Sequence, residues 1–363
     1  MPMKPRIAFV GVAHWHAPIY RECLAALGIE VAGSSDIDAQ AGRAAAGRLA
    51  IDFVPDAADM LARCRPDFVF VTPRHDRALE ELAPVLDCRL PFLVEKPMGV
   101  DGRVAAEAAR RAAAAGSWAA PALPNRLLEI WDRVDRLAES GRLGTIIHAS
   151  FRLINGPPGR YRTLHRVPWM LDPAIGGGGA LRNLGMHGAD AILRLARGAE
   201  PRLHAARLTA HGHGEAVDEY ATALATLPGG AIAQMEAGYS WAPPTGGDFE
   251  WRIAATGAYL QQTKGHLVVR AADGTVEALD TPQPSYQPMV ERVLAVARDC
   301  DQAPAVPAAV GQLLTVGQGL GNGGHALTVG RALPQRLARA VVHADRGVGH
   351  RLAAVERRHP HER

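Results

Sequence analysis

Short apolar runs alternate with helical segments along the first third of the chain. The runs 6–10, 67–71 and 92–94 have the length and composition of buried strands, and helical patterns such as 39–49 lie between them. Neighbouring parallel strands need a crossover connection, which is usually a helix. The repeated strand–helix units therefore predict an α/β domain with a doubly wound parallel sheet of the Rossmann type, which we place at residues 1–123.

The turn after the first strand has the position of a dinucleotide-binding loop. It covers residues 11–16, with the sequence GVAHWH, and leads into a helix from about residue 17. A second strand is expected over 29–33, and Asp36 follows it where such folds hold the adenosine ribose. The acid favours NAD, with NADP left open. The usual Gly-x-Gly-x-x-Gly pattern would need glycine where Ala13 and His16 stand, so the prediction rests on the strand and acid spacing.

Two histidines in this turn, His14 and His16, flank Trp15 and raise the question of a metal site. Two histidines at i and i+2, without a nearby cysteine or a third ligand, fall short of the ligand sets of zinc sites. We therefore expect no metal. These side chains are expected to line the nicotinamide or substrate side of the site.

A lysine stands at the carboxyl end of the strand 92–94, in the sequence Glu95-Lys96-Pro97. Ligands of open α/β sheets bind at that edge. The only other lysines are Lys4 and Lys264, and arginine fills every other Lys/Arg position. An ammonium group can be tuned to give and take a proton near neutral pH, whereas a guanidinium keeps its charge, so Lys96 is a candidate acid–base residue. The simpler alternative is a lysine that pairs with Glu95 and caps the strand.

The composition limits the kinds of partner. The formal net charge is +3 over 363 residues, and the arginines are scattered, so we expect no nucleic-acid partner. The four cysteines form no Cys-x-x-Cys pair, which argues against a zinc knot or a disulfide framework and suits a reducing cytoplasm. No apolar run approaches the roughly 20 residues of a membrane helix, and no signal segment is recognised. We expect a soluble, cytoplasmic protein that binds a small molecule.

The rest of the chain predicts a second domain of different construction, at residues 124–333. Alternating short strands between 202 and 270 predict a large, mostly antiparallel sheet, so this domain is α+β. Helices are expected over 125–139, 288–299 and 308–320. The tail 334–363 is rich in arginine and histidine and is expected to be mobile or weakly helical.

A long irregular segment, 155–169, carries Arg160, Arg166 and Trp169. Loops of this length in a compact domain are usually functional or disordered. Guanidinium groups bind carboxylate and phosphate in bidentate fashion, and suit hydroxyl-rich or anionic substrates. The alternative is a solvated loop or a contact between subunits.

A second motif block covers residues 176–190. Four glycines lead into Asn183 and His187, which stand at i and i+4 and would share one face of a helix. Together with Glu95-Lys96-Pro97 after an apolar strand, this block resembles the Gfo/Idh/MocA oxidoreductases, the glucose-fructose oxidoreductase and inositol dehydrogenase superfamily, over about residues 6–330. In that family an acid is usual at the place of Asn183, and it completes the catalytic site with the lysine and the histidine.

The resemblance also covers the strand 67–71, which ends in Thr72-Pro73. The family usually has an asparagine and a histidine where Arg74 and Arg77 stand here. The fold resemblance survives these departures, whereas the contacts at this point change. Members of the family pair subunits through the open face of the second sheet, which implies a homodimer or a homotetramer.

The resemblance implies three overlapping groups of site residues. The catalytic group is Lys96, Asn183 and His187. The cofactor group is Gly11, Ala13, His14, Trp15, His16, Asp36, Thr72, Pro73, Arg74, Glu95, Lys96 and Pro97. The substrate group is Lys96, Asn125, Arg126, Arg160, Arg166, Trp169, Asn183 and His187.

The activity implied is transfer of a hydride between NAD, or NADP, and a secondary alcohol or ketone carbon of a sugar, polyol or related hydroxy compound. His187 is expected to act as the acid–base group and to set the pH dependence, because Asn183 cannot take a proton. Lys96 is expected to hold the substrate oxygen. A different function is left open by the departures at Ala13, His16 and Asn183: a protein of the same fold with altered chemistry, or one that binds a nucleotide or sugar without turnover.

Overall fold

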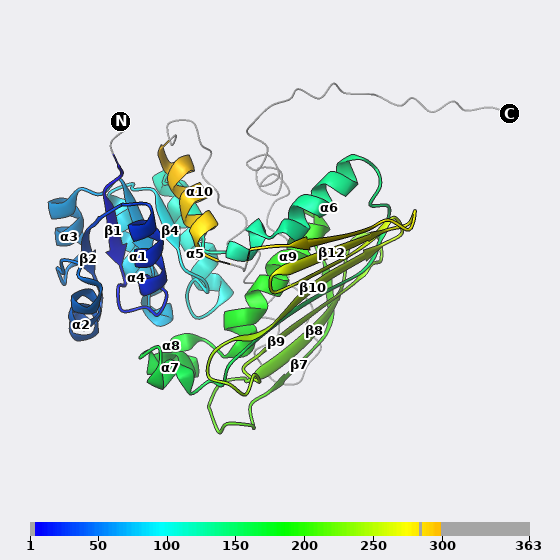
Figure 1. Cartoon of the computed structure of the whole chain (residues 1–363). Helices are drawn as coiled ribbons and strands as arrows, with labels where there is room; N and C mark the ends of the chain where they lie inside the picture. Colours follow the sequence, from blue (N-terminus) through cyan, green and yellow to red (C-terminus); the bar gives the residue numbers. More distant parts are fainter. Residues whose placement is uncertain (1–3, 283–284, 299–363) are drawn as a thin grey trace.

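The chain folds around two sheets that lie side by side (Figure 1). The computed structural model describes residues 4–282 and 285–298. The helix expected over 308–320 and the tail 334–363 lie outside the described residues. The first sheet has five strands and the second has eight, and helices cover the first sheet on both faces and the second on one. The predicted fold class is confirmed.

The five-stranded sheet is parallel, with the order β2-β1-β3-β4-β5. Its direction of winding reverses between β1 and β3, so the carboxyl ends of these two strands flank the place where ligands bind in such folds. Thr72, directly after β3, donates its hydroxyl to the carbonyl oxygen of Gly11, directly after β1, at 2.6 Å. The strands are β1 (Ile7–Val10), β2 (Val31–Ser35), β3 (Phe68–Val71), β4 (Phe92–Val94) and β5 (Ala119–Pro121).

Five α-helices connect these strands. Asp38, Asp56 and Asp101 accept backbone N–H groups at the starts of three of them, as N-cap residues do. The helices that begin after His16 and after Arg77 have no such side-chain cap. The helices are α1 (Ala17–Ala26), α2 (Ala39–Leu49), α3 (Ala57–Cys64), α4 (Ala78–Asp87) and α5 (Gly102–Ala115).

Local details differ from the sequence prediction at three places. The second strand begins at Val31, because the Ile29 N–H bonds back to the carbonyl of Leu24 and closes the end of α1. A strand could also be expected near Phe53, which makes only an isolated bridge with Ser34. The helix expected over 125–139 is divided at Leu128, whose backbone is extended, into the 3-10 turn η2 (Pro124–Leu127) and the helix α6 (Glu129–Glu139).

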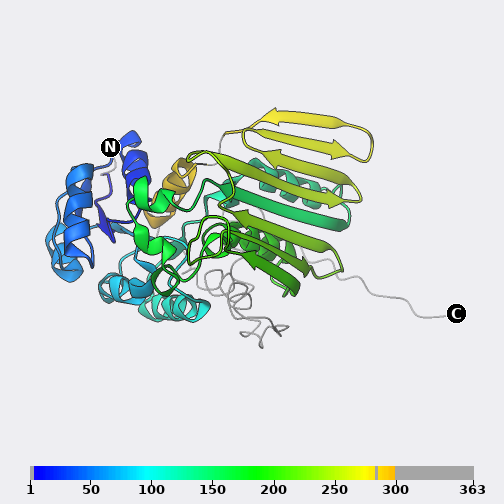
Figure 2. The same ribbon diagram turned by 90° about the horizontal axis from the view of Figure 1, so that it is seen from below.

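The eight-stranded sheet has the order β13-β12-β11-β10-β6-β9-β8-β7 (Figure 2). Only the pair β6 and β9 within it is parallel. Its bounds are β6 (Ile146–Asn155), β7 (Arg202–Thr209), β8 (Tyr220–Thr226), β9 (Ile232–Gly238), β10 (Gly247–Ala255), β11 (Ala258–Thr263), β12 (His266–Ala271) and β13 (Val276–Asp280).

Two helices, α6 and α9 (Met186–Ala196), lie on one face of this sheet (Figure 1). Trp131 of α6 packs edge-on against Trp251 of β10, and Phe151 of β6 completes this buried aromatic group. Gly188 of α9 lies so close to the sheet that a Cβ there would come within 2.9 Å of Met235. The close fit fixes α9, and with it His187, relative to the sheet.

The helix α10 (Gln287–Arg298) follows the last strand and returns to the first domain (Figure 1). Met289, Val290 and Leu294 are buried in the same cluster as Tyr20 and Leu24 of α1. The division at residue 123 therefore describes two sheets, while the chain after the second sheet packs on the first domain. Tyr286, just before α10, is carried to the edge of the five-stranded sheet.

Candidate functional site

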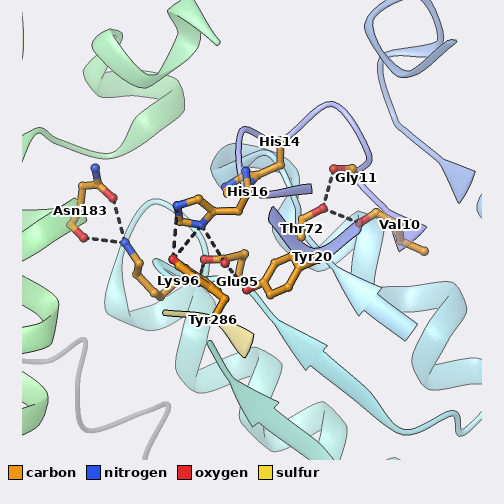
Figure 3. Close-up of polar contacts among 10 residues, drawn as sticks. All are labelled: Val10, Gly11, His14, His16, Tyr20, Thr72, Glu95, Lys96, Asn183 and Tyr286. Carbon is orange, nitrogen blue, oxygen red and sulfur yellow. Dashed lines mark hydrogen bonds and ion pairs between the residues drawn. The ribbon is translucent and has the colours of Figure 1, made fainter. Parts of the chain in front are cut away.

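Lys96 joins the two domains at the carboxyl end of β4 (Figure 3). Its Nζ donates to the main-chain oxygen of Asn183 at 2.9 Å and to the side-chain Oδ1 of Asn183 at 3.1 Å. The side chain is buried, with 5% of the residue exposed. Burial lowers the pKa of Lys96 from 10.5 to about 8, and the Glu95 carboxylate offsets only part of this effect. Lys96 can therefore exchange a proton near neutral pH.

Asn183 is oriented by its own amide group. Its Nδ2 donates to the hydroxyl oxygens of Tyr161 and Tyr239, the latter at 3.1 Å, which turns Oδ1 toward Lys96. Burial raises the pKa of both phenols, so they stay protonated at neutral pH. Asn183 lies in a π-helical turn, η4 (Leu181–Gly185). The regular α-helical spacing expected between Asn183 and His187 is therefore replaced by a π turn followed by α9.

The π turn is held by Asp218. Its carboxylate accepts the N–H groups of Gly179 and Leu181, each at 2.7 Å. A Cβ on Gly179 would lie 1.9 Å from the carbonyl oxygen of Asp218, so glycine is required for this approach. The glycine-rich stretch thus brings the turn, and Asn183 within it, up to the edge of the second sheet.

His187 is buried near Lys96. Its Nδ1 has no hydrogen-bond partner. Burial, and then the charge of Lys96, lower the pKa of His187 well below 6.5. The imidazole is therefore neutral at physiological pH, and of the two residues only Lys96 titrates there. This favours Lys96 over His187 as the group that sets the pH dependence, and the role expected of His187 stays a prediction.

His16 occupies the place of the third fingerprint glycine and pairs with Glu95 (Figure 3). Its Nδ1 lies 2.8 Å from Glu95 Oε1, which also accepts the hydroxyl of Tyr20. The hydroxyl of Tyr286 lies 3.3 Å from each ring nitrogen of His16. Burial lowers the pKa of His16 despite Glu95, so we take the contact as a hydrogen bond from a neutral imidazole to a carboxylate. The bulky side chain is accommodated because Glu95 supplies a buried acceptor.

Glu95 also supports the lysine directly. Its Oε2 accepts the backbone N–H of Lys96 at 2.9 Å. Burial alone would raise the pKa of Glu95, but His16, Lys96 and the Tyr20 hydroxyl outweigh burial and hold it below its usual value. Lys96 makes no side-chain salt bridge with this carboxylate in the described structure. The strand-capping alternative is therefore not favoured by the geometry.

An aromatic group lies beside these residues. Trp15 stacks on His14 with ring centres 3.7 Å apart, and lies 5.8 Å from Trp169 of the second domain. His75, which follows β3, packs edge-on against Trp169 at 5.0 Å. Its Nδ1 lies 2.8 Å from the carbonyl oxygen of Gly176, so it forms a second polar link between the domains.

Gly11 and Asp36 lie at the carboxyl ends of the neighbouring strands β1 and β2. Gly11 has φ +84°, and a Cβ there would lie 2.1 Å from the carbonyl oxygen of Thr72. Asp36 accepts the backbone N–H of Ala13 at 2.8 Å through Oδ2 and that of Asp38 at 2.9 Å through Oδ1. Burial raises the pKa of Asp36, although these backbone hydrogen bonds oppose the rise. Asp36 thus stabilises the turn after β1, near which it was predicted to lie.

Glu81 of α4 is a second carboxyl group at this turn. Its Oε1 accepts the backbone N–H of Arg74 at 3.1 Å, while the buried Oε2 has no partner and lies 2.8 Å from where a Cβ of Gly11 would be. Burial, and then Asp36, raise the pKa of Glu81 to about 8. Glu81 is therefore mostly protonated at neutral pH.

Other residues in the predicted groups have different surroundings. Arg74 pairs with Asp76 at 2.7 Å, and Arg126 binds Asp190. Arg160 donates to His165 at 3.1 Å, and Arg166 is exposed with φ +60°. The main-chain oxygen of Asn125 accepts the indole N–H of Trp131 at 3.0 Å. Pro73 and Pro97 are buried beside the strand ends they follow. The segment 155–169 is not wholly irregular, because it contains the short helix α7 (Arg160–Thr163) and the start of the 3-10 turn η3 (Pro168–Leu171).

Within residues 4–282 and 285–298, no three or more His, Cys, Asp or Glu side chains are grouped so as to hold a metal ion. None of the helices in the described part of the chain is both long and apolar enough to cross a membrane.

The second domain matches a known family model. Residues 131–261 match the family model described as the GFO/IDH/MocA C-terminal domain. This domain belongs to the Gfo/Idh/MocA family. The resemblance predicted from the two motif blocks is thereby confirmed. No curated protein matches the chain in sequence.

Solved structures share the fold of both domains. An oxidoreductase from Agrobacterium radiobacter, in complex with NAD+, L-tartaric acid and magnesium, has TM-score 0.71 and 18% identity over 88% of this chain and 95% of its own. KijD10, a 3-ketoreductase from Actinomadura kijaniata with NADP and TDP-benzene, has TM-score 0.69 and 18% identity over 87% and 96%. A levoglucosan dehydrogenase with NADH and levoglucosan has TM-score 0.72 and 15% identity over 87% and 95%. At these identities the likeness is one of fold.

Several neighbours of Lys96 could not be predicted from the sequence. Tyr161 and Tyr239 orient Asn183, and Tyr286 reaches His16 from 270 residues away. His75 lies between Arg74 and Arg77 in the sequence, and Glu81 has the position of an ordinary helix residue. A buried tyrosine has no local signal, whereas the position of His75 directly after the Thr-Pro strand end could have marked it.

Proposed function

We propose that the chain is an NAD(P)-dependent oxidoreductase that transfers a hydride between the nicotinamide and a secondary alcohol or ketone carbon of a sugar, polyol or related hydroxy compound. One observation carries the proposal. Lys96 is a buried lysine with a pKa lowered to about 8, held by Asn183 at the ligand edge of the first sheet. Such tuning of a lysine is typical of a group that exchanges protons during a reaction.

The residues of the first domain fit a dinucleotide. Gly11 brings the backbone of the turn close to Thr72, and Asp36 lies at the end of β2, where an acid receives the ribose in such folds. The buried nitrogens His14 Nε2 and His75 Nε2 have no partners and offer contacts to a bound group. The complexes with NAD+, NADP and NADH named above also support this cofactor class. The buried Asp36 carboxylate favours NAD(H), because it would repel a 2′-phosphate.

Asn183 directs the proton transfer proposed for Lys96. A neutral amine has two N–H groups and one lone pair, and the two N–H groups are taken by the two oxygens of Asn183. The lone pair is then left to accept the proton of the substrate hydroxyl. In alcohol oxidation, the C–H hydride leaves to the nicotinamide, which supplies the redox chemistry, while the O–H proton passes to Lys96 Nζ and the C=O bond forms.

His187 has a different role in this proposal. Its imidazole is neutral, so it would donate or accept a hydrogen bond at the substrate oxygen or a neighbouring hydroxyl without changing charge. In the direction of ketone reduction the protonated Lys96 returns the proton to the oxygen. The reaction thus balances with one hydride and one proton in each direction.

A protein that binds without turnover is the second candidate, and His16 favours it. A side chain fills the place where the third fingerprint glycine would let helix and sheet approach, and this departs from the usual dinucleotide fingerprint. Tryptophan fluorescence separates binding from no binding, because Trp15 and Trp169 lie at the site.

The deciding experiment uses a panel of ketosugars with NADH or NADPH, and of polyols and sugars with NAD+ or NADP+. Absorbance at the nicotinamide band is followed for the wild type and for Lys96→Met, which keeps a side chain of similar length without the amine. Turnover in the wild type that Lys96→Met abolishes supports the proposed reaction. Binding of the dinucleotide without turnover across the panel would favour the second candidate.

The pairing of subunits is also a proposal. Leu224 of β8 and Ile232 of β9 are 40% and 49% exposed on the large sheet, which is the surface that the family resemblance implies for a homodimer or homotetramer. Light scattering of the purified chain would give the oligomeric state. A cytoplasmic location stays a prediction.

A further inference from the structure

Two buried histidines at the ligand edge of the first sheet each have one ring nitrogen without a hydrogen-bond partner among the described residues. His14 follows β1 and is 4% exposed, and His75 follows β3 and is 1% exposed. The unpartnered atom is Nε2 in both residues. A buried polar atom without a partner is costly, so each of these atoms indicates a missing ligand contact.

The contacts of His14 assign its tautomer. Its Nδ1 accepts the backbone N–H of His16 at 3.1 Å, and must therefore carry a lone pair. Burial, followed by the neighbouring His16, lowers the pKa of His14 well below 6.5, so the ring is neutral and its proton is on Nε2. His14 thus offers a buried N–H donor without an acceptor.

His75 has the opposite hydrogen-bonding role to His14. Its Nδ1 lies 2.8 Å from the carbonyl oxygen of Gly176, which can only accept, so Nδ1 carries the proton. Burial lowers the pKa of His75 to about 3, so the ring is neutral and Nε2 carries a lone pair. His75 thus offers a buried acceptor without a donor.

The two histidines belong to one group of side chains. Both rings pack against Trp15 and against Trp169, at centre distances of 3.7 and 6.3 Å for His14 and of 6.3 and 5.0 Å for His75. The charge of Lys96 acts on both. A group that contacts both Nε2 atoms would therefore lie among flat aromatic rings on the Lys96 side of the first domain.

We propose that His14 and His75 together bind the carboxamide of the nicotinamide ring. His14 Nε2–H donates to the carboxamide oxygen, and the carboxamide NH2 donates to His75 Nε2. This inference rests on the proposed function, because it requires a nicotinamide dinucleotide. It adds His75 to the site and gives His14 a defined contact.

A carboxamide suits these residues better than a substrate hydroxyl does. It carries its acceptor and its donor on two separate atoms of one rigid plane, as two histidines of opposite polarity require. Both histidines come from the loops after β1 and β3, which flank the switch point where dinucleotides lie in such sheets. The substrate, in contrast, is expected on the side of Asn183 and His187.

The test compares NAD+ with 3-acetylpyridine adenine dinucleotide, in which a methyl group replaces the carboxamide NH2 and the carbonyl oxygen is kept. Binding is measured by calorimetry, without substrate. The wild type should bind the acetyl analogue about tenfold more weakly, because His75 Nε2 is left without a donor. Equal affinity of the wild type for the two dinucleotides would overturn the proposal.

Variants of the two histidines show which of them distinguishes NAD+ from the acetyl analogue. In His75→Asn, the new amide can still donate to the carbonyl of Gly176, but no atom remains at the position of Nε2. The affinity for NAD+ should therefore fall about tenfold and be no higher than the affinity for the acetyl analogue. His75→Gln is the matched control, because its longer amide reaches the Nε2 position, and it should keep the preference. His14→Asn should lower the affinity for both dinucleotides by the same factor, since both keep the carbonyl oxygen. A preference for NAD+ that survives in His75→Asn contradicts the assignment.

ADP-ribose separates failure of this inference from failure of the proposed function. It lacks the nicotinamide, so its affinity should be the same in the wild type and in all three variants, which also shows that the variants are folded. If NAD+ and ADP-ribose both fail to bind the wild type, the proposed function itself is wrong. If both bind and the analogue is not discriminated, only the carboxamide contact is wrong.

Discussion

Lys96 and Asn183 are linked across the domain boundary by two hydrogen bonds, and both acceptor oxygens belong to the same residue. Because neither oxygen carries a charge, they hold the amine in place without strongly favouring its protonated form. Burial can then lower the pKa of Lys96 to about 8. A carboxylate at position 183 would have favoured the ammonium instead.

The pH dependence of alcohol oxidation should follow Lys96. The neutral amine is the base and exists above its pKa, so kcat/KM should rise with pH and level off above about pH 8. Lys96→Arg should lower the rate by about 10²–10⁴ and remove this rise, because a guanidinium keeps its proton. The measurement is kcat/KM for the oxidised substrate between pH 6 and 10. His187→Asn is the control and should keep the rise of kcat/KM with pH, since His187 is already neutral over this range. Loss of the rise in that variant would show that His187 sets the pH dependence.

Asn183→Asp should move the same rise to higher pH. An opposite charge beside an amine raises its pKa by roughly 1–3 units, so the neutral amine appears only at higher pH. Activity should be retained at the new plateau, because one carboxylate oxygen can still accept from Nζ. Tyr239→Phe is a useful comparison, since it removes a hydrogen bond to Asn183 Nδ2 without adding charge and should leave the rise in place. A downward shift in the aspartate variant would show that Lys96 is not the titrating group.

His16→Gly tests whether the unusual histidine stabilises Glu95. The change restores the fingerprint glycine but removes the hydrogen bond at 2.8 Å to a buried carboxylate. Hydrogen bonds to charged groups contribute about 1.5–3 kcal/mol, so the free energy of unfolding should fall by about that amount. Denaturant unfolding measures it. In a Glu95→Gln background the same change should cost less, because the acceptor is no longer charged. Equal costs in the two backgrounds would mean that His16 acts through packing alone.

Most of the fold was predictable because it depends on local patterns. Apolar runs of strand length between helical segments determine a parallel sheet, and the helix over 39–49 has the bounds that its sequence suggests. The errors fall where a tertiary contact overrides the local pattern. Ile29 is apolar like a strand residue, yet its N–H closes the end of α1.

The motif residues of the site could be predicted from the sequence, whereas the side chains that orient them could not. Lys96 is marked by its position after a strand and by the scarcity of lysine, and the structure brings it to Asn183 as the motifs imply. Tyr161, Tyr239 and Tyr286 approach from distant segments, and only the folded chain brings them together. The lowered pKa of Lys96 depends on that burial, which no local pattern records.

The affinity for the adenosine diphosphate part of the cofactor should fall above about pH 8 because of Glu81. Burial raises the pKa of this carboxyl group to about 8, so it is neutral below that pH and becomes a carboxylate above it. The charged form would lie beside Gly11, where the negative pyrophosphate is expected, and would repel it. Calorimetry with ADP-ribose between pH 6.5 and 9.5 measures the effect without the nicotinamide end, where Lys96 titrates in the same range. Glu81→Gln cannot ionise and should bind with little dependence on pH. An unchanged fall in affinity in the glutamine variant would assign the pH dependence to another group at the turn.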